Sequence, residues 1–299
     1  MRSEIALRTR FVNARLDHKA EPAELMDLTR FMHGEAERLL SCNGCGLVIR
    51  EESEDSRYAT DVYDRDLLEH LYPRYLEPFR EKARRFNQWL RPHAEVVELG
   101  SHLGAFLQAA EEENWNPTGL DIGEYTSAFG RQKGLRVLRR PIEDTPIGRR
   151  SADALFVWNC FEQLDAPSNV LGSAHGLLKR HGLLVVRIPN YGFYEQCRRR
   201  ARVRALNAAA VRELAYNNLL GFPYLIGYTP ALLASLLSRH GFEPVQGFDS
   251  TLVTLPFSDV SKERRSEEAQ VYAPYRDGTE KGPLTLTGPW IEVVGRKRE

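Results

Sequence analysis

Residues 95–104 read Glu95-Val96-Val97-Glu98-Leu99-Gly100-Ser101-His102-Leu103-Gly104, a short apolar segment that runs directly into a glycine-containing turn. A helical pattern over residues 105–113 follows, and residues 118–122 form a second apolar segment with Asp121 near its end. A glycine turn between a strand and a helix lets the backbone approach a ligand and points helix N–H groups at it. An acidic residue about 20 positions later can accept hydrogen bonds from ribose hydroxyls. This unit predicts a nucleotide-like ligand.

The flanking sequence continues the alternation of strands and helices. Expected strands cover residues 95–99, 118–122, 136–138, 152–158, 182–188, 242–248 and 290–295. Expected helices cover residues 105–113, 124–133, 168–178 and 230–240. A longer helical pattern over residues 62–90 is expected to break near Pro73 or Pro78. Strands that alternate with helices in this way indicate a doubly wound α/β sheet.

The residues of the turn distinguish between two classes of nucleotide-binding protein. Dinucleotide-binding enzymes use G-x-G-x-x-G to hold a pyrophosphate, whereas here Glu98 precedes the turn and would repel one. Its carboxylate suits the cationic methionine end of S-adenosylmethionine instead. The loop resembles motif I of the class I S-adenosylmethionine-dependent methyltransferases, usually written D/E-x-G-x-G-x-G. His102 stands in place of the middle glycine, where a positive φ is costly for a side chain.

The resemblance covers about residues 62–299 and implies a Rossmann-like methyltransferase domain at residues 61–299 with further contacts to the cofactor. Residues 140–146 are similar to the segment that surrounds adenine, and residues 157–164 to the fourth strand and the loop that faces the methyl donor. The expected cofactor-binding residues are Glu98, Gly100, Ser101, His102, Gly104, Asp121, Ile122, Ile142, Glu143, Trp158 and Asn159.

A glutamine occupies the position of the general base found in some members of the family. Those members read E-H-L/V where this chain has Glu162-Gln163-Leu164, and an amide does not accept a proton. Either the base lies elsewhere or none is needed, because positioning of the reactants supplies much of the catalysis. The remaining candidates for a proton acceptor are Tyr191, Tyr194 and Glu195.

Residues 191–228 form a long connection that is expected to make a helical cap over the acceptor pocket. Tyr191, Tyr194 and Tyr228 are expected near the pocket wall, or else they pack the cap onto the sheet. The cap also carries Arg198, Arg199, Arg200, Arg202 and Arg204. These arginines either bind an anionic group of a nucleotide-linked or carrier-linked acceptor, or form a solvated helix face.

The segment Cys42-Asn43-Gly44-Cys45-Gly46-Leu47-Val48 looks like half of a zinc ribbon. It resembles the N-terminal ribbon of some methyltransferases of sugar and natural-product pathways. A structural zinc site needs four ligands, but no second C-x-x-C precedes this one, and His18 and His33 lack paired spacing. Residues 1–60 are therefore expected to form a degenerate ribbon-like region that does not bind zinc.

The composition excludes several other classes of protein. The chain has 299 residues with 41 Lys+Arg and 41 Asp+Glu, so it lacks the basic excess of a general nucleic-acid binder. No apolar run is long enough to span a membrane, and four cysteines suggest a reduced, cytoplasmic protein. The predicted function is methyl transfer from S-adenosylmethionine to a small or medium-sized acceptor, such as a sugar or natural-product intermediate. The alternatives are a non-catalytic scaffold with this fold and, more remotely, an NAD-dependent oxidoreductase.

Overall fold

The structure is a computed structural model of the chain. It describes residues 39–50, 65–204, 207–217, 219, 222, 225–251, 266, 269–271, 273–275 and 278–299. Most of the N-terminal region that was expected to be ribbon-like, including His18 and His33, lies outside these residues. No helix in the described part of the chain has the length and apolar character needed to cross a membrane.

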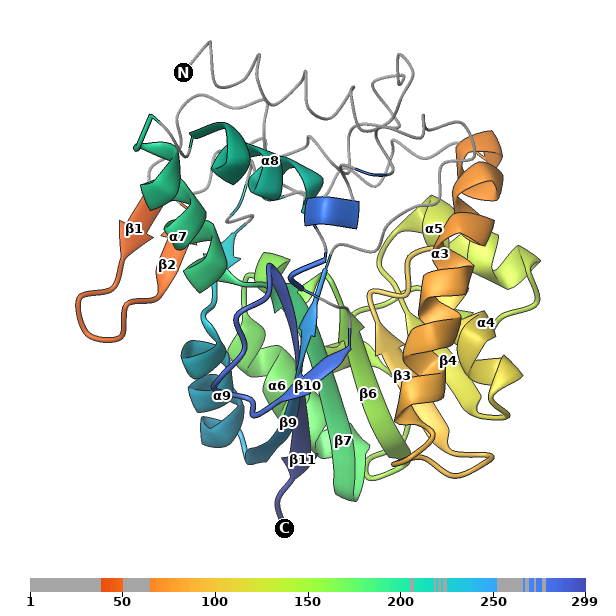
Figure 1. Cartoon of the computed structure of the whole chain (residues 1–299). Helices are drawn as coiled ribbons and strands as arrows, with labels where there is room; N and C mark the ends of the chain where they lie inside the picture. Colours follow the sequence, from red (N-terminus) through yellow and green to blue (C-terminus); the bar gives the residue numbers. More distant parts are fainter. Residues whose placement is uncertain are drawn as a thin grey trace.

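A sheet of eight strands forms the centre of the described structure (Figure 1). The strands are, in spatial order, β10 (Thr279–Lys281), β9 (Phe242–Ser250), β11 (Trp290–Lys297), β7 (Leu178–Pro189), β6 (Ala152–Trp158), β3 (Glu95–Leu99), β4 (Asn116–Leu120) and β5 (Val137–Leu138). The strands from β7 to β5 are parallel, whereas β11 pairs antiparallel with both β7 and β9. The α/β fold with a Rossmann-like sheet, predicted from the sequence, is confirmed.

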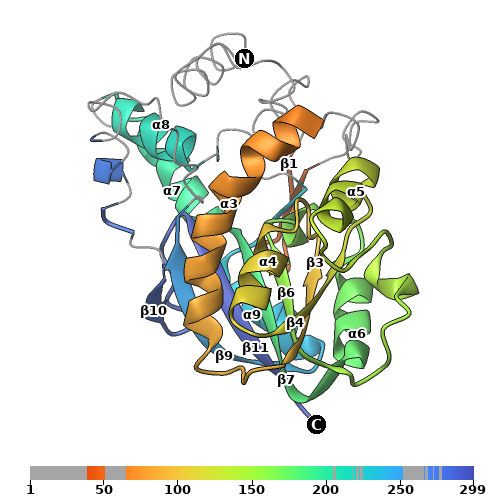
Figure 2. The ribbon, with the colours of Figure 1, turned by 90° about the vertical axis from the view of Figure 1, so that its right-hand side faces the viewer.

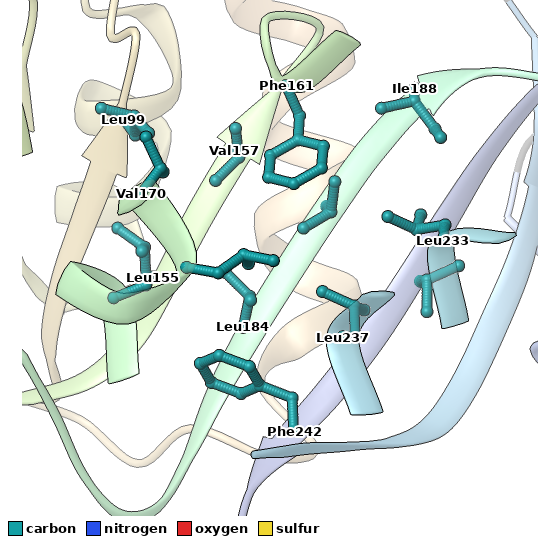
Figure 3. Packing of buried hydrophobic residues seen from close by; sticks show 14 of the residues in the cluster. Leu99, Leu155, Val157, Phe161, Val170, Leu184, Ile188, Leu233, Leu237 and Phe242 are labelled. Carbon is teal, nitrogen blue, oxygen red and sulfur yellow. The ribbon is translucent and has the colours of Figure 1, made fainter. Parts of the chain in front are cut away.

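Helices cover both faces of this sheet. One face packs against α3 (Arg65–Phe86), α4 (Ala105–Glu112) and α5 (Glu124–Gln132), and the other against α6 (Pro167–Leu177) and α9 (Pro230–Arg239). Successive residues of β6 point to opposite faces, so Phe156 and Trp158 pack toward α3 while Leu155 and Val157 pack toward α6. Figure 3 shows the second of these cores, where Leu184 and Leu237 meet between the sheet and α9.

Helix α3 continues through both of its prolines, so the break expected near Pro73 or Pro78 is wrong (Figure 2). A proline inside a helix removes one hydrogen bond and crowds the carbonyl four residues earlier. The carbonyl that loses its donor to Pro73 belongs to Glu69, which is exposed, so water can reach it. Burial of Tyr72, Phe79 and Phe86 on the opposite side holds the helix against the sheet in spite of this cost.

A second, smaller sheet joins the N-terminal part of the chain to the cap. It consists of β1 (Leu39–Ser41), β2 (Val48–Arg50) and β8 (Ile226–Gly227), with antiparallel pairing throughout. Helices α7 (Tyr191–Ala201) and α8 (Asn207–Tyr216) precede β8. Figure 1 places them with the hairpin β1–β2 at the end of the large sheet where β6 and β7 finish. The predicted helical segment is thus located at the carboxyl ends of the parallel strands.

Local signals explain why the elements around this end begin where they do. Asn190 starts α7, because its side-chain oxygen accepts the backbone N–H of Gly192 at 2.9 Å. Thr229 caps α9 in the same way through the N–H of Leu232, and Pro230 follows at the first helical position. Both caps fix the direction in which the chain leaves the carboxyl end of the sheet.

Candidate active site

The carboxyl group of Glu98 is buried near the end of β3, beside the turn of residues 100–104. Its Oε2 atom has no hydrogen-bond partner among the described residues. Burial raises the pKa of Glu98 well above its usual value, and the negative charge of Asp121 adds to the shift. A buried carboxyl without a donor is unfavourable, so this atom marks a place where a donor or cation of a ligand fits.

Two glycines allow the turn to pass close to its neighbours. Gly100 has a φ of +72° and Gly104 a φ of +77°, in the left-handed region that favours glycine. A Cβ atom at Gly100 would lie 2.8 Å from Sγ of Cys160, and one at Gly104 would lie 2.5 Å from Cδ1 of Leu135. Between them, the buried Ser101 hydroxyl has no hydrogen-bond partner within the described structure. The turn therefore combines an approachable backbone with unused polar atoms.

His102 also adopts the left-handed region, with a φ of +47°, although it carries a side chain. Its backbone N–H donates to Oδ2 of Asp121 at 2.6 Å. Its imidazole ring packs edge-on against Tyr75, with ring centroids 5.9 Å apart. These contacts offset the cost that the sequence indicates for a histidine at this position.

Asp121 follows β4 and lies across the turn from Glu98. Its Oδ1 atom accepts hydrogen bonds from the backbone N–H of Gly123 at 2.8 Å and the hydroxyl of Thr126 at 2.9 Å. Its Oδ2 atom accepts only the His102 N–H among the hydrogen bonds that the structure describes, and a carboxylate oxygen can accept more than one. Ile122, the next residue, is 49% exposed and offers an apolar surface at the same edge.

The other expected cofactor residues lie around the same end of the sheet with differing exposure. Ile142 is buried in the same hydrophobic core as Leu99, and Glu143 beside it is exposed. The Trp158 ring packs among aromatic residues toward α3, including Phe156 at 5.6 Å between centroids. Asn159 has a φ of +58° and accepts a hydrogen bond from Arg187 through its side-chain oxygen. Their assignment to cofactor contacts stays a prediction.

A buried cluster of charges supports this end of the sheet. Glu292 on β11 pairs with Lys82 of α3 and lies 3.2 Å from Arg85 and 3.6 Å from Arg187 of β7. Arg187 is 0% exposed and also donates to the Thr251 carbonyl. No sequence motif connects the members of this cluster. One residue in the sequence does point to the cluster, because Arg187 interrupts the otherwise apolar run 182–188. A charge buried in such a strand requires a partner of opposite charge.

Comparison with known proteins identifies the family of this chain. Residues 67–247 match the model of a methyltransferase domain. The chain belongs to this methyltransferase family. The match covers more than half of the 299 residues and includes both the turn of residues 100–104 and Asp121. No curated protein matches the chain.

Solved structures of methyltransferases share the fold. An S-adenosylmethionine-dependent methyltransferase from Thermotoga maritima is 17% identical, with a TM-score of 0.50, over 78% of this chain and 95% of that one. One from Archaeoglobus fulgidus is 19% identical, with a TM-score of 0.50, over 78% and 100%. A chain of the Haloferax volcanii complex between the Trm112 methyltransferase activator and a methyltransferase is 14% identical, with a TM-score of 0.54, over 83% and 100%. The predicted class I, S-adenosylmethionine-dependent methyltransferase is thus confirmed.

The cap of the methyltransferase brings its tyrosines to two different places. Tyr191 and Tyr194 lie 5.8 Å apart, and both rings pack near Phe222, at 6.2 and 5.3 Å. Tyr228 instead packs on Phe161 at the carboxyl end of the sheet, with centroids 5.6 Å apart. The first two rings therefore contribute to the interior of the cap, whereas Tyr228 is the one in contact with the loop after β6.

The charged residues of the cap largely pair with one another. Arg200 binds Glu213 of α8 through two hydrogen bonds of 2.9 Å, and Arg199 pairs with Glu195 at 2.7 Å. Arg198 donates to the Tyr194 hydroxyl at 3.0 Å. These contacts favour the interpretation of the arginines as a solvated helix face. Glu195 is paired with Arg199, and its role as a proton acceptor stays a prediction.

The Cys42–Cys45 segment forms the tip of the hairpin β1–β2. The N–H of Gly46 donates to the Cys42 carbonyl at 2.8 Å, and both thiols are exposed. Hydrogen bonds from the backbone N–H groups of Cys45 and Gly44 lower the pKa of the Cys42 thiol. Within the described ranges no group of three or more metal-ligating side chains occurs.

We expect the purified methyltransferase to contain no stoichiometric zinc, because Cys42 and Cys45 supply two of the four ligands that a structural site requires. Elemental analysis of the full chain after dialysis without chelator tests this. A content of one zinc per chain that disappears in Cys42→Ser would contradict the prediction. Cys197→Ser is the matched control, because Cys197 is buried and far from the hairpin in sequence.

Proposed function

We propose that this methyltransferase holds S-adenosylmethionine in the turn of residues 100–104 and transfers its methyl group to a small or medium-sized acceptor. The main support is the buried Glu98 carboxyl, whose Oε2 has no hydrogen-bond partner among the described residues. It lies next to a turn that has no room for side chains at Gly100 and Gly104. When bound, S-adenosylmethionine supplies an electrophilic methyl group on a positively charged sulfonium. The residues present fit this molecule at both of its ends.

Each end of the proposed ligand meets a group with suitable chemistry. Glu98 suits the amino group of the methionine end, since charge attraction and a hydrogen bond would relieve its burial. Asp121 has acceptor capacity on Oδ2 for a ribose hydroxyl. Ile122 provides exposed apolar surface for the base, and Ser101 adds a free hydroxyl within the described structure.

The acceptor is proposed to enter from the carboxyl end of the sheet, beneath α7 and β8. Asn190 ends β7 at this point, and the chain turns there into the cap. A cap above the strand ends would exclude water and hold the acceptor in position, which supplies much of the catalysis in a displacement reaction. We propose a sugar or natural-product intermediate as acceptor, supported by the resemblance of the Cys42–Cys45 segment to enzymes of those pathways.

Calorimetric titration of the full chain with S-adenosylmethionine tests the function, with NAD as the comparison. We expect saturable binding with one site per chain for S-adenosylmethionine and none for NAD. Binding of NAD alone would support an oxidoreductase. Absence of binding to either molecule would support a scaffold that keeps the fold without the cofactor.

Replacing Asp121 with alanine is expected to weaken S-adenosylmethionine binding by about 1.5–3 kcal/mol, because it removes a charged hydrogen-bond acceptor. This corresponds to roughly a ten- to hundredfold rise in Kd by calorimetry. Glu81→Ala on the exposed side of α3 is the control and should leave Kd unchanged. An Asp121→Ala protein with the affinity of the wild type would contradict the assigned site.

A further inference from the structure

A second buried carboxyl group lies at the carboxyl end of the sheet, and the proposed cofactor site does not use it. Glu162 belongs to η5 (Phe161–Gln163), the single turn that follows β6, and it is 0% exposed. Its Oε1 atom accepts one long hydrogen bond, at 3.4 Å, from the side-chain amide of Gln163. Its Oε2 atom has no hydrogen-bond partner among the residues that the structure describes.

A second orphaned polar group lies on the neighbouring element. Tyr228 follows β8, is 2% exposed, and its hydroxyl likewise has no partner in the described part of the chain. Its ring packs on Phe161, the residue directly before Glu162. Buried polar groups are nearly always hydrogen-bonded, and an exception calls for an explanation, such as a catalytic role or a bound water, ion or ligand. Two of them on adjacent elements indicate that a third polar group binds there.

This pair lies beside the turn that we assign to the cofactor. Cys160, two residues before Glu162, donates its thiol to the Leu99 carbonyl at 3.4 Å, and its Sγ occupies the space that a side chain at Gly100 would need. Burial raises the pKa of the Cys160 thiol, and the charges of Glu162, Asp121 and Glu98 raise it further. Glu162 and the two carboxylates of the cofactor site therefore all lie within electrostatic reach of the same thiol.

We propose that the carboxylate of Glu162 is the proton acceptor for the methylated group of the acceptor, and that the hydroxyl of Tyr228 orients that group. The proposal rests on the proposed function. In the step, a nucleophilic oxygen or nitrogen of the acceptor forms a bond to the methyl carbon, and the carbon–sulfur bond breaks with its electron pair staying on sulfur. The proton of the acceptor O–H or N–H passes to Oε2 of Glu162.

The environment of Glu162 suits this role at neutral pH. Burial raises its pKa to about 7, while the dipole of its own backbone N–H, the Gln163 amide and the positive charge of Arg187 on β7 act in the opposite direction. Among the residues that the structure describes, the other titratable groups that face it are Tyr228 from the β8 side and Cys160 on the same loop. A base works best when its pKa is near the working pH. The Glu162 carboxylate can thus accept a proton, whereas the Gln163 amide cannot.

A proton acceptor in this place serves an acceptor molecule that still carries its proton at neutral pH, such as an aliphatic or phenolic hydroxyl or an amine. An already ionised acceptor would not need Glu162. This difference gives a test that separates a proton acceptor from a residue that only shapes the pocket.

The experiment compares wild type with Glu162→Gln in two acceptor-independent measurements. Infrared titration of the full chain should show a protonated carboxyl band with a midpoint near pH 7 that is missing in Glu162→Gln. Calorimetry should show the same affinity for S-adenosylmethionine in both proteins, within a factor of two. A band that does not titrate near neutrality, or an affinity lost in the variant, would overturn the proposal. Failure of wild type to bind S-adenosylmethionine would instead overturn the proposed function.

A third measurement follows labelled methyl transfer to a panel of amines and phenols, which includes phenol and 4-nitrophenol. With acceptors that retain their proton, Glu162→Gln should lower the rate about 100-fold or more, remove the acidic limb of the pH–rate profile, and be partly rescued by Glu162→Asp. With 4-nitrophenolate the loss should be less than tenfold. Equal losses for phenol and 4-nitrophenol would show that Glu162 acts only through the structure of the pocket. Tyr228→Phe should mainly raise KM.

Discussion

Replacing Glu292 with glutamine is expected to lower the free energy of unfolding by about 3–5 kcal/mol, because removal of one partner from a buried ion pair leaves the other charge poorly compensated. Glu292 is fully buried on β11 and pairs with Lys82, whose ammonium is equally shielded from water. Arg187, also fully buried, lies 3.6 Å from the same carboxylate. The amide of glutamine keeps the shape of the side chain but removes the negative charge that these cations share.

Urea denaturation followed by far-UV circular dichroism measures this loss as a lower midpoint at an unchanged m value. Glu243→Gln is the matched control, since Glu243 is exposed on the adjacent strand β9 and a change there should stay within about 0.5 kcal/mol. A Glu292→Gln protein within about 1 kcal/mol of wild type would show that the cluster does not depend on this carboxylate.

Replacing Phe156 with alanine is expected to cost a similar amount, about 3–5 kcal/mol, through the loss of buried area and the cavity left behind. Phe156 lies at the centre of β6 and is 0% exposed. Its ring contacts Phe106 at 4.7 Å and Phe86 at 5.2 Å between centroids, and it stacks on Trp158. These neighbours belong to α4, α3 and the sheet itself, so the cavity cannot be closed by the movement of a single element.

Thermal and urea unfolding of Phe156→Ala and Phe156→Leu test this interpretation together. Leucine retains most of the apolar volume and should recover more than half of the lost stability. An alanine variant that loses less than about 1 kcal/mol would contradict the packing described for this face. Loss of S-adenosylmethionine affinity at a temperature where the variant is folded would show that the core also positions the turn of residues 100–104.

Much of the fold follows from local patterns in the sequence. The expected strands at residues 95–99 and 152–158 match β3 and β6, and the expected helix at 230–240 differs from α9 by one residue. Burial of one or both faces of a helix or strand imposes a regular spacing of apolar residues, which can be recognised within that segment alone. The strands β1, β2, β8 and β10 have two or three residues, too few to show a period.

The prolines of α3 show where local reasoning is insufficient. The sequence predicts a break near Pro73 or Pro78, but the helix continues because the contacts that stabilise it come from the sheet and its neighbouring helices. The same holds for His102, whose positive φ is supported by Asp121, a residue on the next strand.

The sequence predicts those residues of the candidate site that lie close together in one stretch of the chain. Glu98, the two glycines and Asp121 form one strand–turn–helix–strand unit, so their spacing reveals them. Glu162 and Tyr228 are separated by more than 60 residues and meet only through the packing of Phe161. Likewise, the partner of Lys82 lies 210 positions away. No spacing rule relates residues that tertiary structure alone brings together.

The position of β11 has a consequence for how the protein is made. Strand β11 lies between β7 and β9, yet residues 290–297 follow both of those strands in the chain. While the ribosome is still translating the preceding residues, β7 and β9 have emerged with the edges that β11 will join still unpaired. Unpaired edges of apolar strands readily pair with other chains. We expect nascent chains that stall before residue 290 to require chaperones, and to become protease-resistant only once β11 has left the exit tunnel.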